Sequence, residues 1–517
     1  MAAMNVRTLS ASVATTAGRC SACAAASLVA LLWAAPGRAD GPLGATGQPL
    51  QTSAYKVDLT QTPVLGGSRV TGIAGAYVAI AEGIDGNTQT PVSPAVRPAY
   101  SYDYFDYDLG VGVTLTAVLR NTDFFNTGRN TQLDAKQSGF VFLTPAINLT
   151  YGNFGVGLTL ELQHYEISQN ETLTPQTSRH ALAADFTVGH VQAAYSLLQQ
   201  QLTLGVGARI VSLGLSEATD GQQDLFSTEG AGAEVGMLVR PNDQRFRIGA
   251  AFRSSVTTTP HAGSGVQPNA QGDRIVGGGP GQIPALWLPN SVTLPWDLNA
   301  GFALMLGPKA FNPIWYHDQE GLASFRRVLQ GRRERRRSQA RAWVEQARRE
   351  GRDEESLRTA LQAEDDRQTA LEDAALAMQE HSLRSELKKR NAQRSRAYVL
   401  ISSSVLLTGP VRDAVGVESF LGRVVNRSGQ HVGISPRIGM ETETVPNWMR
   451  VRAGTYGEPS RSEGGRARVH GTLGMEVKVF PWNVFGLWDD DAQWRISGSL
   501  DVAKRYLGWG VAIGNWY

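Results

Sequence analysis

The feature that most constrains this chain is a strict alternation of bulky apolar side chains with small or polar ones. It is clearest in the last eleven residues, LGWGVAIGNWY, where Leu507, Trp509 and Val511 share one parity while Gly508 and Gly510 share the other. Successive side chains of a β-strand point to opposite faces, so one face of this segment is bulky and the other is nearly bare. A helix would place glycines on every side and lose stability at each. The pattern therefore predicts a strand that needs an apolar environment on one face only.

The same alternation recurs in fourteen runs, although those at 180–198 and 396–409 alternate poorly. The runs cover about 103–119, 138–151, 153–167, 180–198, 201–216, 229–240, 244–257, 291–307, 396–409, 431–444, 447–457, 466–482, 492–504 and 507–517. Most are longer than the ~5–6 residues usual in soluble sheets, and a tilted strand needs ~9–11 residues to cross a bilayer. A soluble sandwich would turn the apolar parity inward and a transmembrane barrel would turn it to lipid. Strand length favours the barrel.

The connections between the runs support the same choice. Those after odd-numbered runs are long, whereas those after even-numbered runs are mostly tight, such as Gly152 and the turn at 241–243. This asymmetry is typical of outer-membrane barrels, and an even strand number places both termini in the periplasm. Aromatic residues gather near the first and last runs, where interface girdles belong. They are Tyr100, Tyr102, Tyr104, Phe105, Tyr107, Trp482, Phe485, Trp488, Trp494, Trp509, Trp516 and Tyr517.

Residues 1–39 are predicted to be a cleaved export signal. Basic residues precede the apolar run AAASLVALLWAA, and Gly37 and Ala39 supply the small residues before a cleavage site at Asp40. The alternative is a buried N-terminal helix. Both cysteines, Cys20 and Cys23, lie in this segment, so the predicted mature chain has no disulfide, catalytic thiol or cysteine-bound metal.

Residues 40–99 precede the first run and are expected to fold into the lumen as a plug. The stretch Gly72–Glu82 is small, apolar and compatible with a helix, and it is closed by Gly83 and Gly86. The alternative is an extra strand that pairs on the outside.

This segment resembles the start of the long-chain fatty-acid outer-membrane transporters, the FadL/TodX/OMPP1-like family. The family form G-x-x-G-A-[FY]-x-A-x-A-[DE] is matched by Gly72, Gly75, Ala76, Tyr77, Ala79, Ala81 and Glu82. Ser93, Pro94 and Ala95 stand where the family has Asn-Pro-Ala, so serine replaces the asparagine. A second stretch, IGMETETVPNWMRVRAGTYGEPS, is similar to a later family segment, with Arg450, Arg452, Gly454 and Glu458 in register.

The resemblance implies a fourteen-stranded barrel with an N-terminal plug that passes hydrophobic molecules toward a lateral opening or the periplasm. The serine at position 93 leaves the gating detail of the plug open. Members of the same superfamily also act as shuttles in protein secretion, so the fold does not decide the cargo.

Residues 318–395 interrupt the barrel pattern between the eighth and ninth runs. The segment is rich in charge and in strong helix formers, contains no proline, and is divided by Gly351. A sparse apolar stripe predicts a helical hairpin, and its place after an even-numbered run predicts a periplasmic location. Two interpretations remain open, a docking arm for a periplasmic protein partner and a solvated, self-paired hairpin. Because the chain is exported, nucleic acid is excluded as the ligand of the basic run at 332–337.

The sequence carries no catalytic motif, so no enzyme activity, cofactor or metal site is predicted. The alternative is a hydrolase whose serine, histidine and aspartate meet across strands. Lumen-facing charges of mixed sign predict paired networks that brace the wall and hold the plug. The alternative is that Arg450 and Arg452 bind a carboxylate head group through forked hydrogen bonds.

The long loop at 259–290 ends in apolar residues that would either capture a hydrophobic ligand or cap the barrel. These candidates are Ile283, Leu286, Trp287 and Leu288, with Phe124 and Phe125 of the first long loop lining the same mouth.

Together, these features predict an all-β protein, a transmembrane antiparallel barrel of about 14 strands in the Gram-negative outer membrane. Strands one to eight occupy 100–317 and strands nine to fourteen occupy 396–517. The predicted function is passive passage of hydrophobic small molecules, such as long-chain fatty acids, past a plug. The candidate gate residues are Gly72, Gly75, Ala76, Tyr77, Ser93, Pro94 and Ala95. The alternatives are an anchor or shuttle component of an envelope or secretion complex, and an open polar porin, which the plug disfavours.

Overall fold

The computed structural model describes residues 43–97, 101, 103–116, 123–128, 141–168, 181–217, 224–262, 268–277, 285–315, 318–481 and 493–516. The predicted export signal lies outside the described residues. So do Ile283 and several of the aromatic residues predicted for the girdles, namely Tyr100, Tyr102, Trp482, Phe485, Trp488 and Tyr517.

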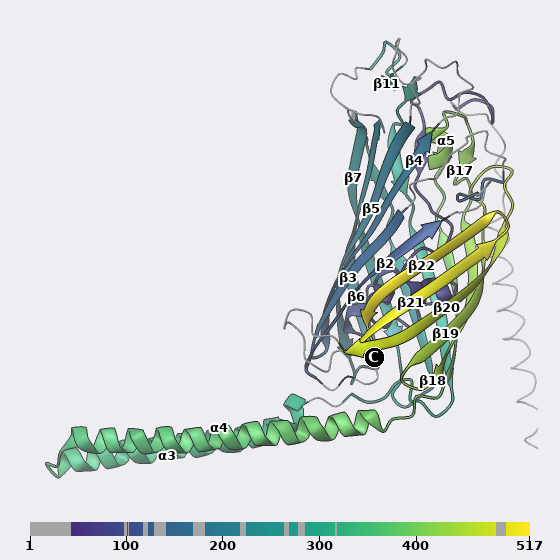
Figure 1. The fold of residues 1–517 in the computed structure, drawn as a ribbon. Helices are drawn as coiled ribbons and strands as arrows, with labels where there is room; N and C mark the ends of the chain where they lie inside the picture. Colours follow the sequence, from purple (N-terminus) through teal and green to yellow (C-terminus); the bar gives the residue numbers. More distant parts are fainter. Residues whose placement is uncertain are drawn as a thin grey trace, which may run out of the picture.

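Within these ranges, fourteen antiparallel strands form one closed barrel (Figure 1). They are β2 Phe105–Thr116, β3 Val141–Tyr151, β4 Phe154–Ser168, β5 Ala181–Leu197, β6 Leu202–Glu217, β7 Asp224–Val239, β8 Phe246–Arg253, β14 Asp297–Leu306, β15 Val399–Thr408, β18 Gly433–Val445, β19 Met449–Glu458, β20 Arg468–Pro481, β21 Gln493–Ala503 and β22 Tyr506–Asn515. The pairing of β2 with β22 and of β7 with β8 closes the ring. The fourteen barrel strands are confirmed, including the two whose alternation was poor, but residues 256–257 and 291–294 of the runs predicted at 244–257 and 291–307 belong to short strands outside the barrel.

The two parities of each strand lie on opposite faces of the barrel wall. In β4, Phe154, Val156 and Leu158 are 40–44% exposed on the outside, whereas the intervening Gly155 and Gly157 are buried. Large apolar side chains are exposed in the same way on other strands around the ring. The outer surface is therefore an apolar band, as a lipid-facing barrel requires. None of the described helices is long and apolar enough to cross a membrane.

A second, five-stranded sheet covers one end of the barrel. Its order is β17-β16-β1-β13-β9, and β1 pairs in parallel with both β13 and β16. The elements of this cap are β1 Lys56–Asp58, β9 Val256–Thr258, β13 Ser291–Leu294, β16 Ala414–Gly416 and β17 Arg427–Ser428, with helix α5 Val417–Leu421 beside them. Two short strands, β11 Ile275–Val276 and β12 Leu286–Trp287, pair with each other, and β10 His261–Ala262 extends the barrel beside β7.

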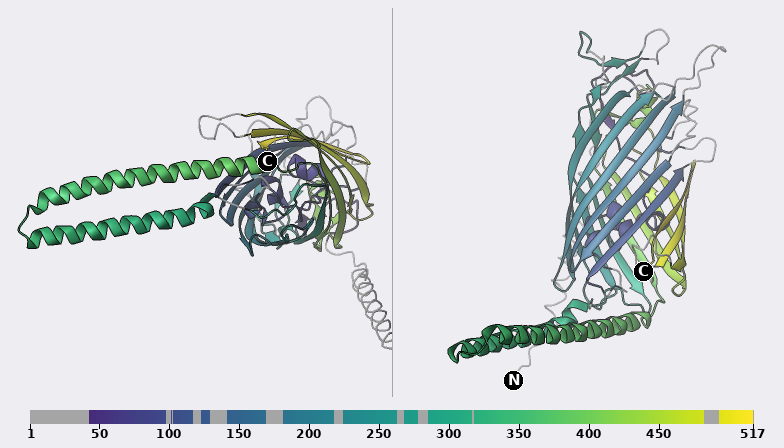
Figure 2. Two further views of the ribbon diagram at one scale, coloured as in Figure 1. Left: turned by 90° about the horizontal axis from the view of Figure 1, so that it is seen from below. Right: turned by 60° about the vertical axis from the view of Figure 1, so that its left-hand side comes forward.

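Residues 63–97, called the lumenal segment below, lie inside the barrel (Figure 2). They contain α2 Ser68–Gly72 and two 3-10 helices, η1 Ile84–Thr88 and η2 Ser93–Ala95. The stretch Gly72–Glu82, which the sequence left compatible with a helix, is instead a series of tight turns. The reason is local, because Ala74, Gly75 and Ala81 adopt positive φ angles of 59°, 72° and 53° that an α-helix does not allow.

Two long antiparallel helices, α3 Asp318–Arg349 and α4 Glu354–Ala392, project sideways from the other end of the barrel (Figures 1 and 2). The C-terminus lies at this same end (Figure 1). At 1.5 Å per residue the helices are ~48 and ~58 Å long. Asp353 caps α4 by accepting hydrogen bonds from the backbone N–H groups of Glu355 and Ser356 at 3.1 and 3.3 Å.

Candidate functional site in the barrel lumen

Glycines on the inner face of the wall let the backbone of the lumenal segment approach very closely. A Cβ atom added at Gly155 would overlap the backbone of Pro94, and one added at Gly205 would overlap that of Pro91. The same holds for Gly249, Gly439 and Gly454, which face Val78, Ile73 and Ala74. The bare parity of the strands therefore accommodates a packed polypeptide inside the barrel.

The residues predicted for the gate all lie in this buried segment. Tyr77 and Ala76 have no exposed surface, and Ser93 and Ala95 are 1% exposed. A Cβ at Gly72 would lie 3.0 Å from the Cα of Gly474 in β20. The carbonyl of Pro94 accepts a hydrogen bond from Thr150 of β3, and that of Ala95 accepts one from Ser196 of β5. The structure thus brings the predicted gate residues together against several strands.

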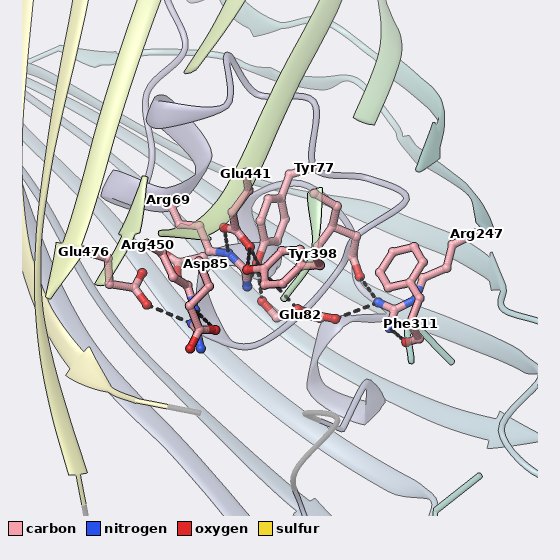
Figure 3. Close-up of polar contacts among 12 residues, drawn as sticks. Arg69, Tyr77, Glu82, Asp85, Arg247, Phe311, Tyr398, Glu441, Arg450 and Glu476 are labelled. Atoms are coloured by element: carbon pink, nitrogen blue, oxygen red, sulfur yellow. Dashed lines mark hydrogen bonds and ion pairs between the residues drawn. The ribbon is translucent and has the colours of Figure 1, made fainter. Parts of the chain in front are cut away.

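A buried ion-pair network joins the lumenal segment to the wall (Figure 3). Arg69 of α2 donates to both carboxylate oxygens of Glu441 in β18, at 2.8 and 2.9 Å. Its third nitrogen donates to the hydroxyl of Tyr77 at 2.7 Å, and that hydroxyl donates to the carbonyl of Glu82. Arg247 of β8 holds Glu82 from the opposite side at 2.9 Å.

The network continues along the wall and returns to the lumenal segment. Glu441 also accepts a hydrogen bond from Arg452 at 2.6 Å, and Arg452 donates to Glu476 at 2.5 Å. Arg495 of β21 links Glu476, at 2.9 Å, to Asp85 in η1, at 2.6 Å. Both ends of this chain of charges, Arg69 and Asp85, belong to the lumenal segment. Opening the lumen therefore requires these pairs to separate or to move together.

The arginines proposed from the sequence as head-group ligands belong to this network. Arg450 donates to Glu476 at 2.9 Å, and its guanidinium also lies over the ring of Trp516, 4.0 Å from the ring centroid. Arg452 is held by Glu441 and Glu476 as described above. Both arginines are therefore engaged in ion pairs with the wall, which is the arrangement that the bracing interpretation expects.

Electrostatics in the lumenal segment favour the ionised form of Glu82. Burial by itself would raise the pKa of this carboxyl, but Arg247 and Arg69 outweigh burial and lower the pKa to about 2. The hydroxyl of Tyr77 has its pKa raised, first by burial, and so stays protonated as a hydrogen-bond donor. Of the network residues within the lumenal segment, the sequence analysis named Tyr77 and Glu82 but missed Arg69 and Asp85. Arg69 could have been found from the sequence, because it is a lone charged residue in an otherwise apolar segment.

A cavity of about 160 Å³ lies between the lumenal segment and the wall. Its lining contains both apolar and charged side chains. The apolar lining consists of Leu59, Pro63, Val64, Leu65, Phe186, Val188, Leu294, Pro295 and Leu406, and the charged lining consists of Glu161, His190, Arg209, Arg253, Asp297 and Arg437. An amphiphilic environment of this kind suits a small molecule with an apolar body and a polar end.

Among the arginines that line this cavity, Arg437 is the least compensated. Arg209 and Arg253 share the carboxylate of Asp297 at 3.0 and 3.1 Å. Arg437 makes only 3.4 Å hydrogen bonds, to the hydroxyl of Ser435 and the carbonyl of Gly75. In the part of the chain that the structure describes, no carboxylate lies within ion-pair distance of Arg437. Its guanidinium is therefore available to an anionic group in the cavity.

The apolar candidates from the long loops pack into the cap. Leu286 and Leu288 have no exposed surface and Phe124 is 3% exposed, and all three belong to one hydrophobic cluster under the capping sheet. Phe125 packs against the same cluster, and its ring meets that of Phe124 edge to face. The carbonyl of Trp287 accepts a hydrogen bond from Tyr55. Of the two roles predicted for this loop, the packing corresponds to the cap.

No group of three or more histidine, cysteine, aspartate or glutamate side chains that could hold a metal ion occurs among the described residues. The buried histidines instead take part in hydrogen bonds with carboxylates. His470, for example, lies between Asp501 at 2.7 Å and Glu458 at 2.5 Å.

Comparison with known proteins gives structural likenesses only. No model of a protein family matches the chain, and no curated protein matches its sequence. The fold is similar to that of the P. putida toluene transporter TodX, with 11% identity and a TM-score of 0.44 over 88% of this chain and 98% of that chain. It is also similar to the monoaromatic hydrocarbon channel CymD, with 8% identity and a TM-score of 0.42 over 88% of this chain and 97% of that chain. The closed ring of fourteen strands establishes the fold class independently of these likenesses.

Proposed function

We propose that the protein is a channel of the Gram-negative outer membrane that passes small hydrophobic molecules past the lumenal segment. The observation that carries this proposal is the cavity between that segment and the wall, whose lining combines apolar residues with charged ones. The exposed apolar band around the barrel supports a location in a lipid bilayer.

The size of the cavity supports a small ligand or the end of a larger one. A cavity of ~150 Å³ with an apolar lining holds one benzene molecule, and the cavity here is about 160 Å³. It would take a single aromatic ring, or the carboxylate end of a fatty acid whose chain extends toward the cap. TodX is described as a toluene transporter and CymD as a monoaromatic hydrocarbon channel. We propose the same class of ligand here, with long-chain fatty acids as the second ligand class.

In this mechanism the lumenal segment is the plug predicted from the sequence. A ligand enters from the capped end, occupies the cavity beside Val64 and Leu65, and leaves when the segment shifts against the glycines of the wall. Because the wall and the segment are joined by ion pairs rather than by covalent bonds, the shift needs no bond to be made or broken.

The test is binding of two probes to the purified, refolded protein, a fluorescent fatty acid and radiolabelled toluene. Val188→Trp fills the cavity and should abolish saturable binding of toluene. Arg437→Gln should weaken fatty-acid binding about 10- to 100-fold, the contribution of a hydrogen bond to a charged group, and leave toluene binding unchanged. The matched control is Arg245→Gln, because Arg245 is exposed and does not line the cavity. Absence of saturable binding of either probe to the unmodified protein would contradict the proposal.

A further inference from the structure

The helical hairpin runs across the axis of the barrel, beside the end at which the C-terminus lies (Figure 1). Since a barrel spans the membrane along its axis, the hairpin extends roughly parallel to the membrane surface. Its two helices are joined by ion pairs of Arg333 and Arg336 with Glu372, and Leu322, Leu329 and Leu387 are buried. This geometry leaves one flank of the hairpin directed toward the membrane and one directed away from it.

A contact with the barrel identifies the flank that faces the membrane. Arg384 of α4 lies 3.7 Å from Asp103, which precedes the first barrel strand. Asp373 is eleven residues, or about three turns, before Arg384, so the two side chains share a face of α4. Asp373 accepts a hydrogen bond from Arg333 of α3 at 2.5 Å. The flank of α3 that carries Arg333 is therefore on the barrel side too.

Three more arginines lie on that flank of α3. Arg337, Arg341 and Arg348 follow Arg333 at four, eight and fifteen residues, which keeps them within about a quarter turn of it. Arg341 and Arg348 are exposed, and neither has a carboxylate within ion-pair distance among the described residues. They lie ~35 and ~45 Å along α3 from its first residue, well away from the barrel wall. Helix α3 as a whole carries ten arginines and four acidic residues, a net charge of +6.

We propose that the hairpin lies along the periplasmic surface of the membrane and binds anionic phospholipid head groups through Arg337, Arg341 and Arg348. Arginine is suited to this role because its planar guanidinium donates two parallel hydrogen bonds to a phosphate. Polybasic segments near a membrane are attracted by anionic lipids over about one Debye length, ~8–10 Å. The occupant of this flank is then lipid, and the hairpin fixes how the barrel is seated in the bilayer.

The test uses the mature chain with one introduced cysteine, Ser338→Cys, which carries a spin label on an exposed position of α3. The protein is reconstituted in nanodiscs of phosphatidylcholine alone or of phosphatidylcholine with phosphatidylglycerol. The nanodiscs also contain a lipid with a paramagnetic head group, which relaxes the spin label when the hairpin lies on the membrane. The extent of this relaxation measures the fraction of hairpins that are docked. We expect strong relaxation only with phosphatidylglycerol, and its loss in high salt.

Two double variants with the same charge change separate the flanks. Arg341→Gln with Arg348→Gln should lower the ratio of docked to free hairpins about 30-fold, since each basic residue near an anionic surface contributes ~1 kcal/mol. Arg332→Gln with Arg335→Gln alters the opposite flank and should change the ratio less than about threefold. Within the described part of the hairpin, none of the four side chains makes an ion pair with the other helix, so both variants should keep their helical circular dichroism.

Equal relaxation in the two kinds of nanodisc would overturn the proposal, as would equal effects of the two double variants. The first result would leave a periplasmic protein as the partner of the hairpin. Because no probe of transport is used, failure of this test is distinct from failure of the proposed channel function.

Discussion

The ion-pair network predicts that one wall carboxylate, Glu441, contributes strongly to holding the lumenal segment in place. Glu441 of β18 is 2% exposed and accepts hydrogen bonds from Arg69, Arg452 and Tyr398. Glu441→Gln preserves the shape of the side chain but removes its charge. Arg69 would then keep only Glu82, at 3.2 Å, as an ionic partner.

The magnitude follows from the burial of these groups. Removing one partner of a buried ion pair costs ~3–5 kcal/mol, because the remaining charge stays desolvated. Glu441 accepts hydrogen bonds from two arginines, so we expect the cost of Glu441→Gln to be at least ~3 kcal/mol. If the wall stays folded, the whole cost lowers the free energy of opening the lumenal segment. The equilibrium population of the open segment should then rise about 150- to 4,000-fold.

Native-state hydrogen exchange measures this population directly. The amides of Gly75, Ile80 and Ala81 are suitable reporters, because each donates a backbone hydrogen bond within the lumenal segment. Their protection factors should fall by the same 150- to 4,000-fold, while amides in the middle of β5 and β6 keep theirs.

A matched control is Asp185→Asn in β5, which removes a carboxylate whose side chain is 63% exposed and pairs with His164. Surface pairs contribute ~0–1 kcal/mol, so the reporter amides should change little. The double variant with Arg69→Gln should recover part of the loss, because the stranded charge is removed. Unchanged protection in Glu441→Gln would refute the view that the buried ion pairs hold the segment.

Three further predictions concern the cap, the wall and the hairpin. Burial, and then Asp123, raises the pKa of Glu418 in α5 from 4.5 to about 7. The folded state therefore binds the proton of Glu418 more tightly than the unfolded state, so α5 should lose stability as pH rises from about 4.5 to about 7. Hydrogen exchange of the α5 amides measures this loss, and in Glu418→Gln the pH dependence of that exchange should disappear. Gly155→Leu should displace the lumenal segment, at a cost of ~1–3 kcal/mol, and should therefore raise ion conductance in planar bilayers. Gly214→Leu is the control and should leave the conductance unchanged, because a Cβ atom there meets no atom within 4 Å. Leu329→Ala should lower the stability of the hairpin by ~2–5 kcal/mol, seen as an earlier helical melt by circular dichroism with the barrel transition unchanged.

The barrel itself could be predicted because its signal is local. Alternation in a run such as Phe154–Leu162 depends only on the two-residue period of a strand, so it can be read without knowing which strand lies beside it. Even β5, whose alternation is poor, was found because its neighbours and tight turns bounded it. The length of the runs then separated a membrane barrel from a soluble sandwich.

The candidate site was harder to predict because its contacts join distant parts of the chain. Arg450 and Arg452 were proposed as ligands of a carboxylate head group, but the ring brings Glu476 of the neighbouring strand next to both. Arg437 is also an arginine on the inner face of the wall, but among the described residues it has no carboxylate partner such as Glu476. No local sequence pattern reveals this difference. The loop residues Leu286 and Leu288 likewise read as an apolar loop tip and are buried in the cap.

The sequence by itself determined the strands, their number, the two faces of the wall and the presence of a charged helical hairpin, since each depends on a short-range period or on composition. Only the tertiary structure decided what fills the lumen and which charges are satisfied there. Arg69 and Glu441 are 372 residues apart and meet only because the ring closes around the lumenal segment. In a buried site the position of each partner decides whether a charge is neutralised or left to bind a ligand, and position is a property of the closed barrel.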